Sequence, residues 1–268
     1  MKILFLGDVI GLSGCKAIIH HLPNQIKKKE IDFVIINGEN CSEQGVGITE
    51  KIANNLFSCG VNVITSGNHI WDQKETANHI EKEDRLLRPH NSFSPAPGKG
   101  FQIFTLNDGL KIGILNLMGN VFMKKSENVF EAAKKFLQNN QLKKDYDFLI
   151  LDFHAETTSE KMAMGHFFDG KATLVVGTHT HVPTNDARIL ENGTAYQTDA
   201  GMSGNYNSVI GMDKNVSIKR FLKENVAKNF PTPDNITLCG VIVEADLNTG
   251  LAKNIQSFIY GGELKNSH

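Results

Sequence analysis

Short apolar runs, separated by polar and glycine-containing segments, recur along the first part of the chain. Three of these runs have the length and the β-branched content of buried strands: Lys2–Gly7, Asp32–Asn37 and Val61–Ser66. Between them, Gly14–Lys28 and Thr49–Cys59 repeat apolar residues at helical spacing, and Pro23 is expected to break or restart the first helix. This alternation of strands and helices predicts a parallel sheet with right-handed crossovers.

The later part of the chain adds hairpin signals. Three pairs of apolar runs flank turn sequences that end in glycine, at 107–109, 191–193 and 248–250. Helical spacing returns at Asn128–Lys143, and further strands are expected at Phe148–Phe153 and Ala172–Val176. Two layers of strand, covered by helices on both outer faces, accommodate this pattern. We therefore predict an α/β fold, a four-layer α/β/β/α sandwich, in a single domain that spans 1–268.

Two sequences of the capping-box type predict additional helix starts. Asp72 is followed three residues later by Glu75, and Thr157 is followed at the same spacing by Glu160. In such a box the first side chain accepts a hydrogen bond from the backbone of the fourth residue, and the fourth side chain reaches back to the first. We expect a short helix to follow each pair, with these polar side chains as its cap.

Composition narrows the function classes. The 268 residues include 28 Lys and Arg against 29 Asp and Glu, a net charge of −1 that indicates neither a basic nucleic-acid scaffold nor an acidic tail. No run approaches the ~18–20 apolar residues of a transmembrane helix, and the N-terminal run is too short for a signal peptide. The 4 cysteines form no CxxC pair, as expected of free thiols in a reducing compartment. We expect a cytoplasmic protein with no membrane partner.

Side chains that can ligate metals follow five of the predicted strands. They are Asp8, the pair Glu39 and Asn40, the pair Asn68 and His69, His154, and the pair His179 and His181. Because the carboxyl ends of parallel strands meet at one edge of a sheet, we expect these side chains to converge there. Taken singly, each has an ordinary structural explanation, such as a helix cap, a turn or, for His69, packing against Trp71.

Taken together, these side chains predict a metal site. Their mixed nitrogen and oxygen donors suit iron, manganese or zinc better than calcium or magnesium. The candidate ligands outnumber those of one tetrahedral ion, so two ions about 3.5–4 Å apart that share Glu39 are the natural arrangement. Such ion pairs catalyse in-line displacement at phosphorus. His69 suits proton donation to a leaving group at neutral pH, and Asp152 or Glu156 could orient a ligating imidazole.

Four short motifs, read in chain order, resemble the calcineurin-like metallophosphoesterases: Gly-Asp-Val-Ile-Gly at 7–11, Asn-Gly-Glu-Asn at 37–40, Gly-Asn-His at 67–69 and Gly-Thr-His-Thr-His at 177–181. The chain departs from the pattern of that superfamily at three points. Ile10 stands where the first motif has a histidine, Glu39 replaces the bridging aspartate, and Asn40 follows it. These departures look like the bacterial branch of 2′,3′-cyclic-nucleotide 2′-phosphodiesterases.

The resemblance to that branch extends over most of the chain, through the segments 66–72, 88–91, 152–161, 177–184 and 198–204. It implies the calcineurin-like metallophosphoesterase fold, and it implies a proton-donor role for His69. It also implies how two ions would be held. One ion would take Asp8, Glu39, Asn40 and His181, and the other would take Glu39, Asn68, His154 and His179.

The function that this resemblance implies is a di-metal phosphodiesterase. It would convert 2′,3′-cyclic nucleotides to 3′-nucleotides through attack by a metal-bridging hydroxide. Its cofactors would be two divalent or trivalent ions, with iron or manganese favoured and zinc compatible. Its partner would be a small-molecule phosphodiester, a cyclic nucleotide, or an RNA end, and we expect a homo-oligomer. Two alternatives stay open: a phosphomonoesterase or protein phosphatase, and a regulatory protein that binds metal and nucleotide with little turnover.

Overall fold

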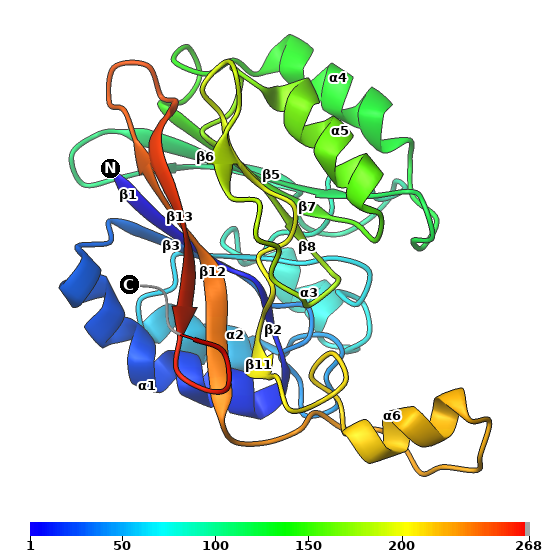
Figure 1. The fold of residues 1–268 in the computed structure, drawn as a ribbon. Helices are drawn as coiled ribbons and strands as arrows, with labels where there is room; N and C mark the ends of the chain where they lie inside the picture. The colour runs from blue at the N-terminus through cyan, green and yellow to red at the C-terminus, as the bar shows by residue number, and fades with distance from the viewer. Residues whose placement is uncertain (266–268) are drawn as a thin grey trace.

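Two β-sheets face each other between outer helices in the computed structural model, which describes residues 1–265 (Figure 1). The seven-stranded sheet has the order β2-β11-β12-β1-β3-β4, with β13 paired to β12. Its strands are β1 (Lys2–Leu6), β2 (Asp8–Val9), β3 (Phe33–Asn37), β4 (Val63–Thr65), β11 (Met202–Asn205), β12 (Ile236–Ala245) and β13 (Ala252–Tyr260). Strands β1, β3 and β4 are mutually parallel, as the alternation of strands and helices predicted.

The second sheet has six strands in the order β5-β6-β7-β8-β10-β9. They are β5 (Phe101–Thr105), β6 (Lys111–Met118), β7 (Phe148–His154), β8 (Leu174–Thr178), β9 (Arg188–Ile189) and β10 (Ala195–Gln197). The four central strands, β6, β7, β8 and β10, are parallel, and each edge strand is added by a hairpin. The three predicted hairpins are confirmed, because β12 and β13 also pair antiparallel.

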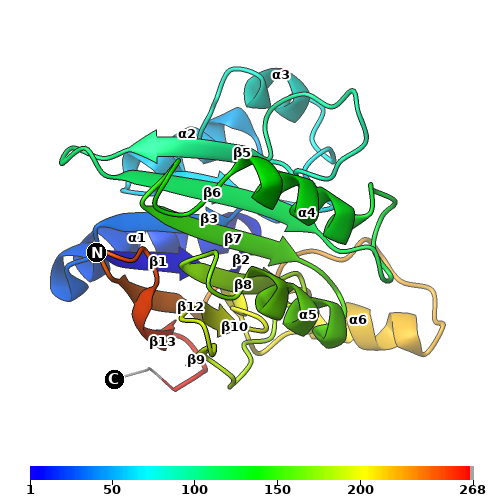
Figure 2. The ribbon, with the colours of Figure 1, turned by 90° about the horizontal axis from the view of Figure 1, so that it is seen from above.

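Helices cover the outer face of each sheet, and one further helix projects away from them (Figures 1 and 2). They are α1 (Gly11–Lys29), α2 (Glu50–Ser58), α3 (Thr76–Ile80), α4 (Val129–Asn139), α5 (Thr158–Phe168) and α6 (Lys214–Phe221). Helices α1 and α2 lie on the seven-stranded sheet, and α4 and α5 lie on the six-stranded sheet. Helix α6 projects away from both sheets. The predicted four-layer α/β/β/α sandwich is therefore confirmed.

Alternate residues of the strands supply three separate apolar cores. In β1, Leu4 and Leu6 point toward α1 and α2, whereas Ile3 and Phe5 point toward the second sheet. In β7, Ile150 also faces the space between the sheets, and the residues that flank it on the strand face α4 and α5. This period of two means that inner strands such as β1 and β7 are buried on both faces, which explains why they are almost continuously apolar in sequence. Strands β5, β9 and β13 are partly exposed.

Helix α1 does not follow the prediction for Pro23. The helix begins at Gly11 rather than Gly14 and runs without a break through Pro23 to Lys29. A proline inside a helix removes one backbone hydrogen bond, at a cost of about 3 kcal/mol. The buried side chains of Ile18 and Leu22 pack on the sheet and offset that cost.

The two capping boxes are also wrong in their side-chain contacts. Helix α3 starts only at Thr76 and has no side-chain cap among the described residues, and the carboxylate of Asp72 contacts His69 instead. Helix α5 does start next to Thr157, but within 1–265 it too lacks a side-chain cap. The carboxylate of Glu160 accepts the backbone N–H groups of a neighbouring loop at 120–121. Asp72 thus pairs with a residue of its own loop and Glu160 with a separate loop, in place of a helix cap.

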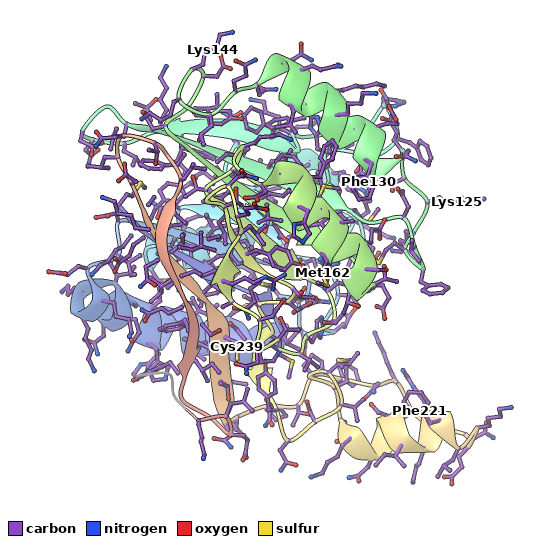
Figure 3. All side chains as sticks on the ribbon, turned by 45° about the horizontal axis from the view of Figure 1, so that its top comes forward. Lys125, Phe130, Lys144, Met162, Phe221 and Cys239 are labelled. Atoms are coloured by element: carbon purple, nitrogen blue, oxygen red, sulfur yellow. The ribbon has the colours of Figure 1, made fainter. Side chains whose placement is uncertain are left out.

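Segment 206–234, which includes α6, was not anticipated from the sequence, and neither was β11. Helix α6 projects from the body of the molecule (Figure 3), and its apolar side chains Ile218 and Phe221 are 51% and 83% exposed. The segment has little hydrophobic periodicity, so pattern analysis found no helix there. Within residues 1–265, none of the helices is long and apolar enough to span a membrane.

The same truncation of an isoleucine should lower the free energy of unfolding by different amounts between the sheets and on α6. Ile150→Ala removes a side chain that is fully buried between the sheets and should lower the free energy of unfolding by about 2–5 kcal/mol. Ile218→Ala, the same change on α6, should cost less than about 1 kcal/mol because that side chain is half exposed. Urea unfolding of both variants checks this, and equal losses would contradict the assignment of the inter-sheet core.

Candidate metal centre

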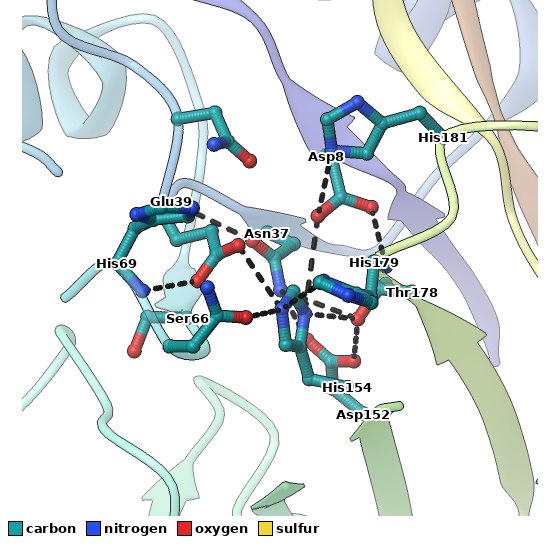
Figure 4. A network of polar contacts seen from close by, with 12 residues as sticks. Asp8, Asn37, Glu39, Ser66, His69, Asp152, His154, Thr178, His179 and His181 are labelled. Atoms are coloured by element: carbon teal, nitrogen blue, oxygen red, sulfur yellow. Dashed lines mark hydrogen bonds and ion pairs between the residues drawn. The ribbon is translucent and has the colours of Figure 1, made fainter. Parts of the chain in front are cut away.

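The carboxyl ends of parallel strands from both sheets meet at one edge of the molecule (Figure 4). Asp8 lies in β2, Glu39 and Asn40 follow β3, and Asn68 and His69 follow β4. The six-stranded sheet contributes the last residue of β7, His154, and the two histidines that follow β8, His179 and His181. Contacts connect these segments across the two sheets, so the convergence expected from the sequence is found.

Four candidate ligands converge on one point. The Nε2 atom of His154 lies 3.0 Å from Oε1 of Glu39, 3.1 Å from Oδ1 of Asn68 and 3.1 Å from Nδ1 of His179. Two ligand atoms that bind one ion at right angles, each about 2.1 Å from it, lie about 3.0 Å apart. The spacing of these four atoms therefore fits a shared ion, and Glu39, His154 and His179 form the tight triad of this site.

Neighbouring side chains fix which imidazole nitrogen faces the centre. Thr178 donates its hydroxyl to Asp152 at 2.7 Å, so it accepts from Nδ1–H of His154 at 2.9 Å. For His179, the atom beside Glu156 is Nε2, at 3.1 Å. In the neutral form of each ring, which is the form that ligates a metal, both contacts leave the converging nitrogen with a free lone pair. The expectation that Asp152 or Glu156 orients an imidazole is met by both residues, the first through Thr178.

The second candidate group is more open. Oδ1 of Asp8 lies 3.9 Å from Nε2 of His181, and Nδ1 of that ring donates to the carbonyl oxygen of Ile210 at 2.8 Å. Asn40 uses its amide nitrogen to donate to Gly45 at 2.8 Å, which leaves its oxygen free. The side chain of Ile10 does not join this group, because it is buried against the backbone of a neighbouring glycine loop.

Three buried oxygen atoms at this edge are poorly satisfied within the described part of the chain: Oδ1 of Asp8, Oε1 of Glu39 and Oδ1 of Asn40. Oε1 of Glu39 can accept a hydrogen bond from His154 when Nε2 of that ring is protonated, and the other two atoms have no donor among the described residues. The three residues are 0%, 1% and 5% exposed, so water does not solvate these atoms. Buried oxygens without a partner are costly, and a charged one is more costly still. Bound cations would satisfy all three atoms, so the residues present fit a metal centre.

Burial and mutual contact also shift the pKa values of the candidate ligands at this edge. Burial by itself would raise the pKa of Glu39, but His154 outweighs it and lowers that pKa to about 2. Burial would lower the pKa of His154, but the carboxylates of Glu39 and Asp8 raise it to about 9. Burial and the nearby His154 lower the pKa of His179 to about 3. A proton on His154 thus compensates Glu39, at the place where a cation would do so.

His69 belongs to a separate part of the edge. Its backbone N–H donates to Oε2 of Glu39 at 2.9 Å, and its Nδ1 lies 2.6 Å from the carboxylate of Asp72. Lys124 lies 3.6 Å from the other oxygen of Asp72. Asp72, predicted from its spacing to be a helix cap, is instead the partner of His69, and this pair was not predicted. In the calcineurin-like superfamily the Gly-Asn-His motif is followed directly by an acidic residue. Asp72, three residues after His69, could have been identified as the equivalent acid from that pattern.

Two histidines of the edge hold strained backbone conformations. His179 and His181 have φ angles of 97° and 66°, a region that non-glycine residues seldom occupy. The backbone N–H of His179 donates to Asp8 at 3.0 Å. Between the histidines, Thr180 donates both its N–H and its hydroxyl to Asp199, at 3.2 and 2.7 Å.

Asp199, which accepts the two hydrogen bonds of Thr180, belongs to a buried ion pair. Lys161 of α5 lies 2.6 Å from the carboxylate of Asp199, and both side chains are 1% exposed. The other oxygen of Asp199 accepts the N–H of Gly201, whose carbonyl in turn accepts the N–H of Asp8. The pair therefore ties the histidine loop to the strand that carries Asp8. Neither residue was predicted to have a role, because an isolated lysine and an isolated aspartate do not form a recognisable motif.

A third polar network links the two sheets beneath the centre. Asn37 and Thr65, at the ends of β3 and β4, donate to Oδ2 of Asp152 at 2.9 and 2.5 Å. Burial raises the pKa of Asp152 to about 6 despite these donors. The same carboxylate supports Thr178 and hence His154, so the register between the sheets and the orientation of the ligand depend on one residue.

Comparisons with known proteins agree with this geometry. The model of the family described as YmdB-like protein matches residues 4–258. The 2′,3′-cyclic-nucleotide 2′-phosphodiesterase of Bacillus subtilis (strain 168) is 42% identical over 260 residues, which is 97% of either chain.

Two solved structures are similar over nearly the whole chain. A novel phosphatase from Mycoplasma pneumoniae has a TM-score of 0.90 at 37% identity, over 98% of this chain and 94% of that one. A hypothetical protein from Thermus thermophilus has a TM-score of 0.89 at 35% identity, over 98% and 100% of the two chains. The arrangement of the layers is thus shared with experimentally determined folds.

The contact between Thr178 and His154 yields a prediction about metal affinity. Thr178→Val removes the acceptor that holds His154 and should weaken metal binding about 10–100-fold. Thr173→Val is the matched control: its hydroxyl is equally buried, but it contacts Gly250 and Leu149, away from the centre. Both variants should lose about 1–3 kcal/mol of stability. Competition with a chelating dye measures affinity, and equal affinities in the two variants would contradict the assigned role.

Proposed function

The chain belongs to the YmdB-like protein family, and on that basis we propose that it is a metal-dependent phosphodiesterase that acts on 2′,3′-cyclic nucleotides. The observation that carries the proposal is the convergence of three ligand atoms within 3.1 Å of a fourth, Nε2 of His154, beside buried oxygens without donors in the described chain. The name of the Bacillus subtilis relative supports the substrate class.

We assign the candidate ligands to two ions in the proposal. Glu39, Asn68, His154 and His179 hold the first, and Asp8, Glu39, Asn40 and His181 hold the second. Mixed nitrogen and oxygen donors favour iron or manganese, and zinc is also compatible. When bound, such a pair stabilises charge on the phosphoryl oxygens and supplies a nucleophile from water at neutral pH. The longer distance between Asp8 and His181 makes the second position the weaker one.

His69 is the proton donor in this proposal. The Asp72 carboxylate accepts from Nδ1 of His69 at 2.6 Å and orients the imidazolium ring, so Nε2 carries the proton that can be transferred. Hydrolysis breaks the bond from phosphorus to the 2′ oxygen, which takes the proton from Nε2 and leaves as a hydroxyl group. The product is the 3′-nucleotide. The ring is 30% exposed, so water can return the proton.

A terminal cyclic phosphate on RNA has the same chemistry as a free cyclic nucleotide and is a second possible source of substrate. The expected homo-oligomer and the single domain stay predictions. A phosphomonoesterase is the alternative activity, and the name of the Mycoplasma pneumoniae structure, a novel phosphatase, favours it. The His69–Asp72 pair favours turnover over a purely regulatory binding role, because binding alone does not need a proton donor.

Substitution of the proton donor should separate proton transfer from metal binding. His69→Ala should lower kcat for 2′,3′-cyclic AMP by about 10²–10⁴-fold. Turnover of bis-p-nitrophenyl phosphate should fall much less, because its leaving group needs no proton. Metal content should not change. His20→Ala, at an exposed histidine of α1, is the control. Wild-type turnover of the cyclic nucleotide by His69→Ala would exclude the role.

Metal removal should affect activity and stability together. A chelator should abolish turnover and lower Tm by about 5–10 °C, since a ligand at 100 times its Kd adds about 2.7 kcal/mol. Mn²⁺ or Fe²⁺ should restore both. Asp8→Asn should reduce the metal content measured by elemental analysis toward one ion per chain. Unchanged turnover and Tm after complete metal removal would contradict the proposed centre.

A further inference from the structure

A pocket of about 310 Å³ opens next to the metal centre. Its wall includes Asn68 from the loop after β4, Phe93 from the proline-containing loop at 89–97, and Lys124 and Lys125 from the loop before α4. The volume lies at the lower end of the range for small-molecule sites, about 300–1,000 Å³. A single nucleoside fits such a volume, whereas a folded protein domain does not enter it.

The pocket and the metal centre share one residue. The side-chain oxygen of Asn68 points to Nε2 of His154, and its backbone carbonyl accepts a hydrogen bond from Lys124 at 2.6 Å. The preceding residue, Gly67, also lines the pocket, and a Cβ there would lie 2.2 Å from Nε2 of His154. Residues 67 and 68 therefore contact the metal centre on one side and line the pocket on the other. A ligand whose phosphate lies at the centre can place its adjoining group in the pocket.

Two exposed aromatic rings line this pocket. Trp71 is 39% exposed and Phe93 is 56% exposed, and Trp71 follows His69 by two residues. Large aromatic side chains that remain exposed in a concave site commonly stack on flat ligands. Every nucleobase offers a flat π face, and stacking on one aromatic ring contributes about 1–3 kcal/mol per base.

The charge at the rim suits the same ligand. The Lys124 side chain is 57% exposed, and Lys125 projects from the neighbouring part of the loop (Figure 3). Two cations beside an otherwise apolar pocket favour an anionic ligand with a flat apolar portion. A nucleotide has both features.

We propose that this pocket binds the nucleobase of the substrate, with Trp71 and Phe93 as its stacking surfaces. The inference rests on the proposed phosphodiesterase function and adds the source of its selectivity for nucleotides. The base sits over the segment 67–71 while the phosphodiester lies at the strand ends, so the distance from His69 to the leaving oxygen is set by the same segment that holds the base.

The first test compares two cyclic diesters. 2′,3′-Cyclic AMP carries a base, and glycerol 1,2-cyclic phosphate has the same five-membered diester without one. The wild type should prefer the nucleotide by at least about 10-fold in kcat/KM. Trp71→Ala should lower kcat/KM for the nucleotide by about 5–150-fold, mainly through KM, and should leave the glycerol ester unchanged. Trp71→Phe should retain most of the preference.

Matched variants control for general effects of losing an aromatic ring. Phe93→Ala should reduce the preference for the nucleotide, whereas Phe221→Ala, at an 83% exposed position on α6, should not. Equal turnover of both diesters by the wild type would overturn the inference. A parallel loss on both substrates in Trp71→Ala and Phe93→Ala would also overturn it, because the pocket would then support the fold rather than the base.

A second readout does not depend on turnover. The chain contains 1 tryptophan, so intrinsic tryptophan fluorescence reports on Trp71 alone. Adenosine 3′-phosphate should quench it with saturation, and glycerol phosphate should not. If neither diester is hydrolysed by metal-loaded protein, the proposed function fails and this titration decides the inference by itself. Absence of quenching up to millimolar nucleotide would then overturn it.

Discussion

Burial of charged and polar oxygens without donors is the constraint on which the rest of the edge depends. Asp8 and Asn40 each place an oxygen where neither water nor a hydrogen-bond donor of the described residues reaches it, and Oε1 of Glu39 is buried 3.0 Å from Nε2 of His154. A protein keeps such atoms only if something positive compensates them. Without a metal, the proton on His154 compensates Glu39 alone and leaves the other two oxygens unpaired within 1–265. The arrangement is therefore one that cations complete.

Rigid surroundings hold this unfavourable arrangement in place. Left-handed backbone at His179 and His181 costs about 1–3 kcal/mol per residue and persists only where its surroundings determine it. The buried pair of Lys161 and Asp199 holds the loop that carries both histidines, and Asp152 holds the strand ends of the two sheets together. Removal of one partner of a buried pair leaves a charge uncompensated. Lys161, Asp199 and Asp152 therefore influence the metal centre by positioning its candidate ligands.

Sequence pattern predicted the layers well because both faces of the inner strands are buried, which leaves long apolar runs that are easy to recognise. It also predicted that the candidate ligands converge, because parallel strands end at a common edge and each end carries a ligand-type residue. It failed where a side chain has two possible local partners and where the partner is remote in sequence. Asp72 has the spacing of a cap with Glu75 but pairs with His69, three residues before it, and Lys161 pairs with Asp199, 38 residues away. Spacing alone does not decide between two local partners, and it contains no information about a remote one.

Selectivity in this enzyme class has to come from outside the metal edge. The proposed ions and proton donor would act only on the phosphoryl group and the leaving oxygen, which mononucleotides, RNA ends and phosphoproteins all present. Binding energy from a part of the substrate that does not react can lower the barrier if it fixes the reacting group in place. The segment 67–71 is suited to that coupling, because Asn68 contacts His154 of the candidate metal centre and Trp71 lines the pocket, with His69 between them. In the proposed function, this one short loop would connect recognition of the base with the geometry of proton transfer.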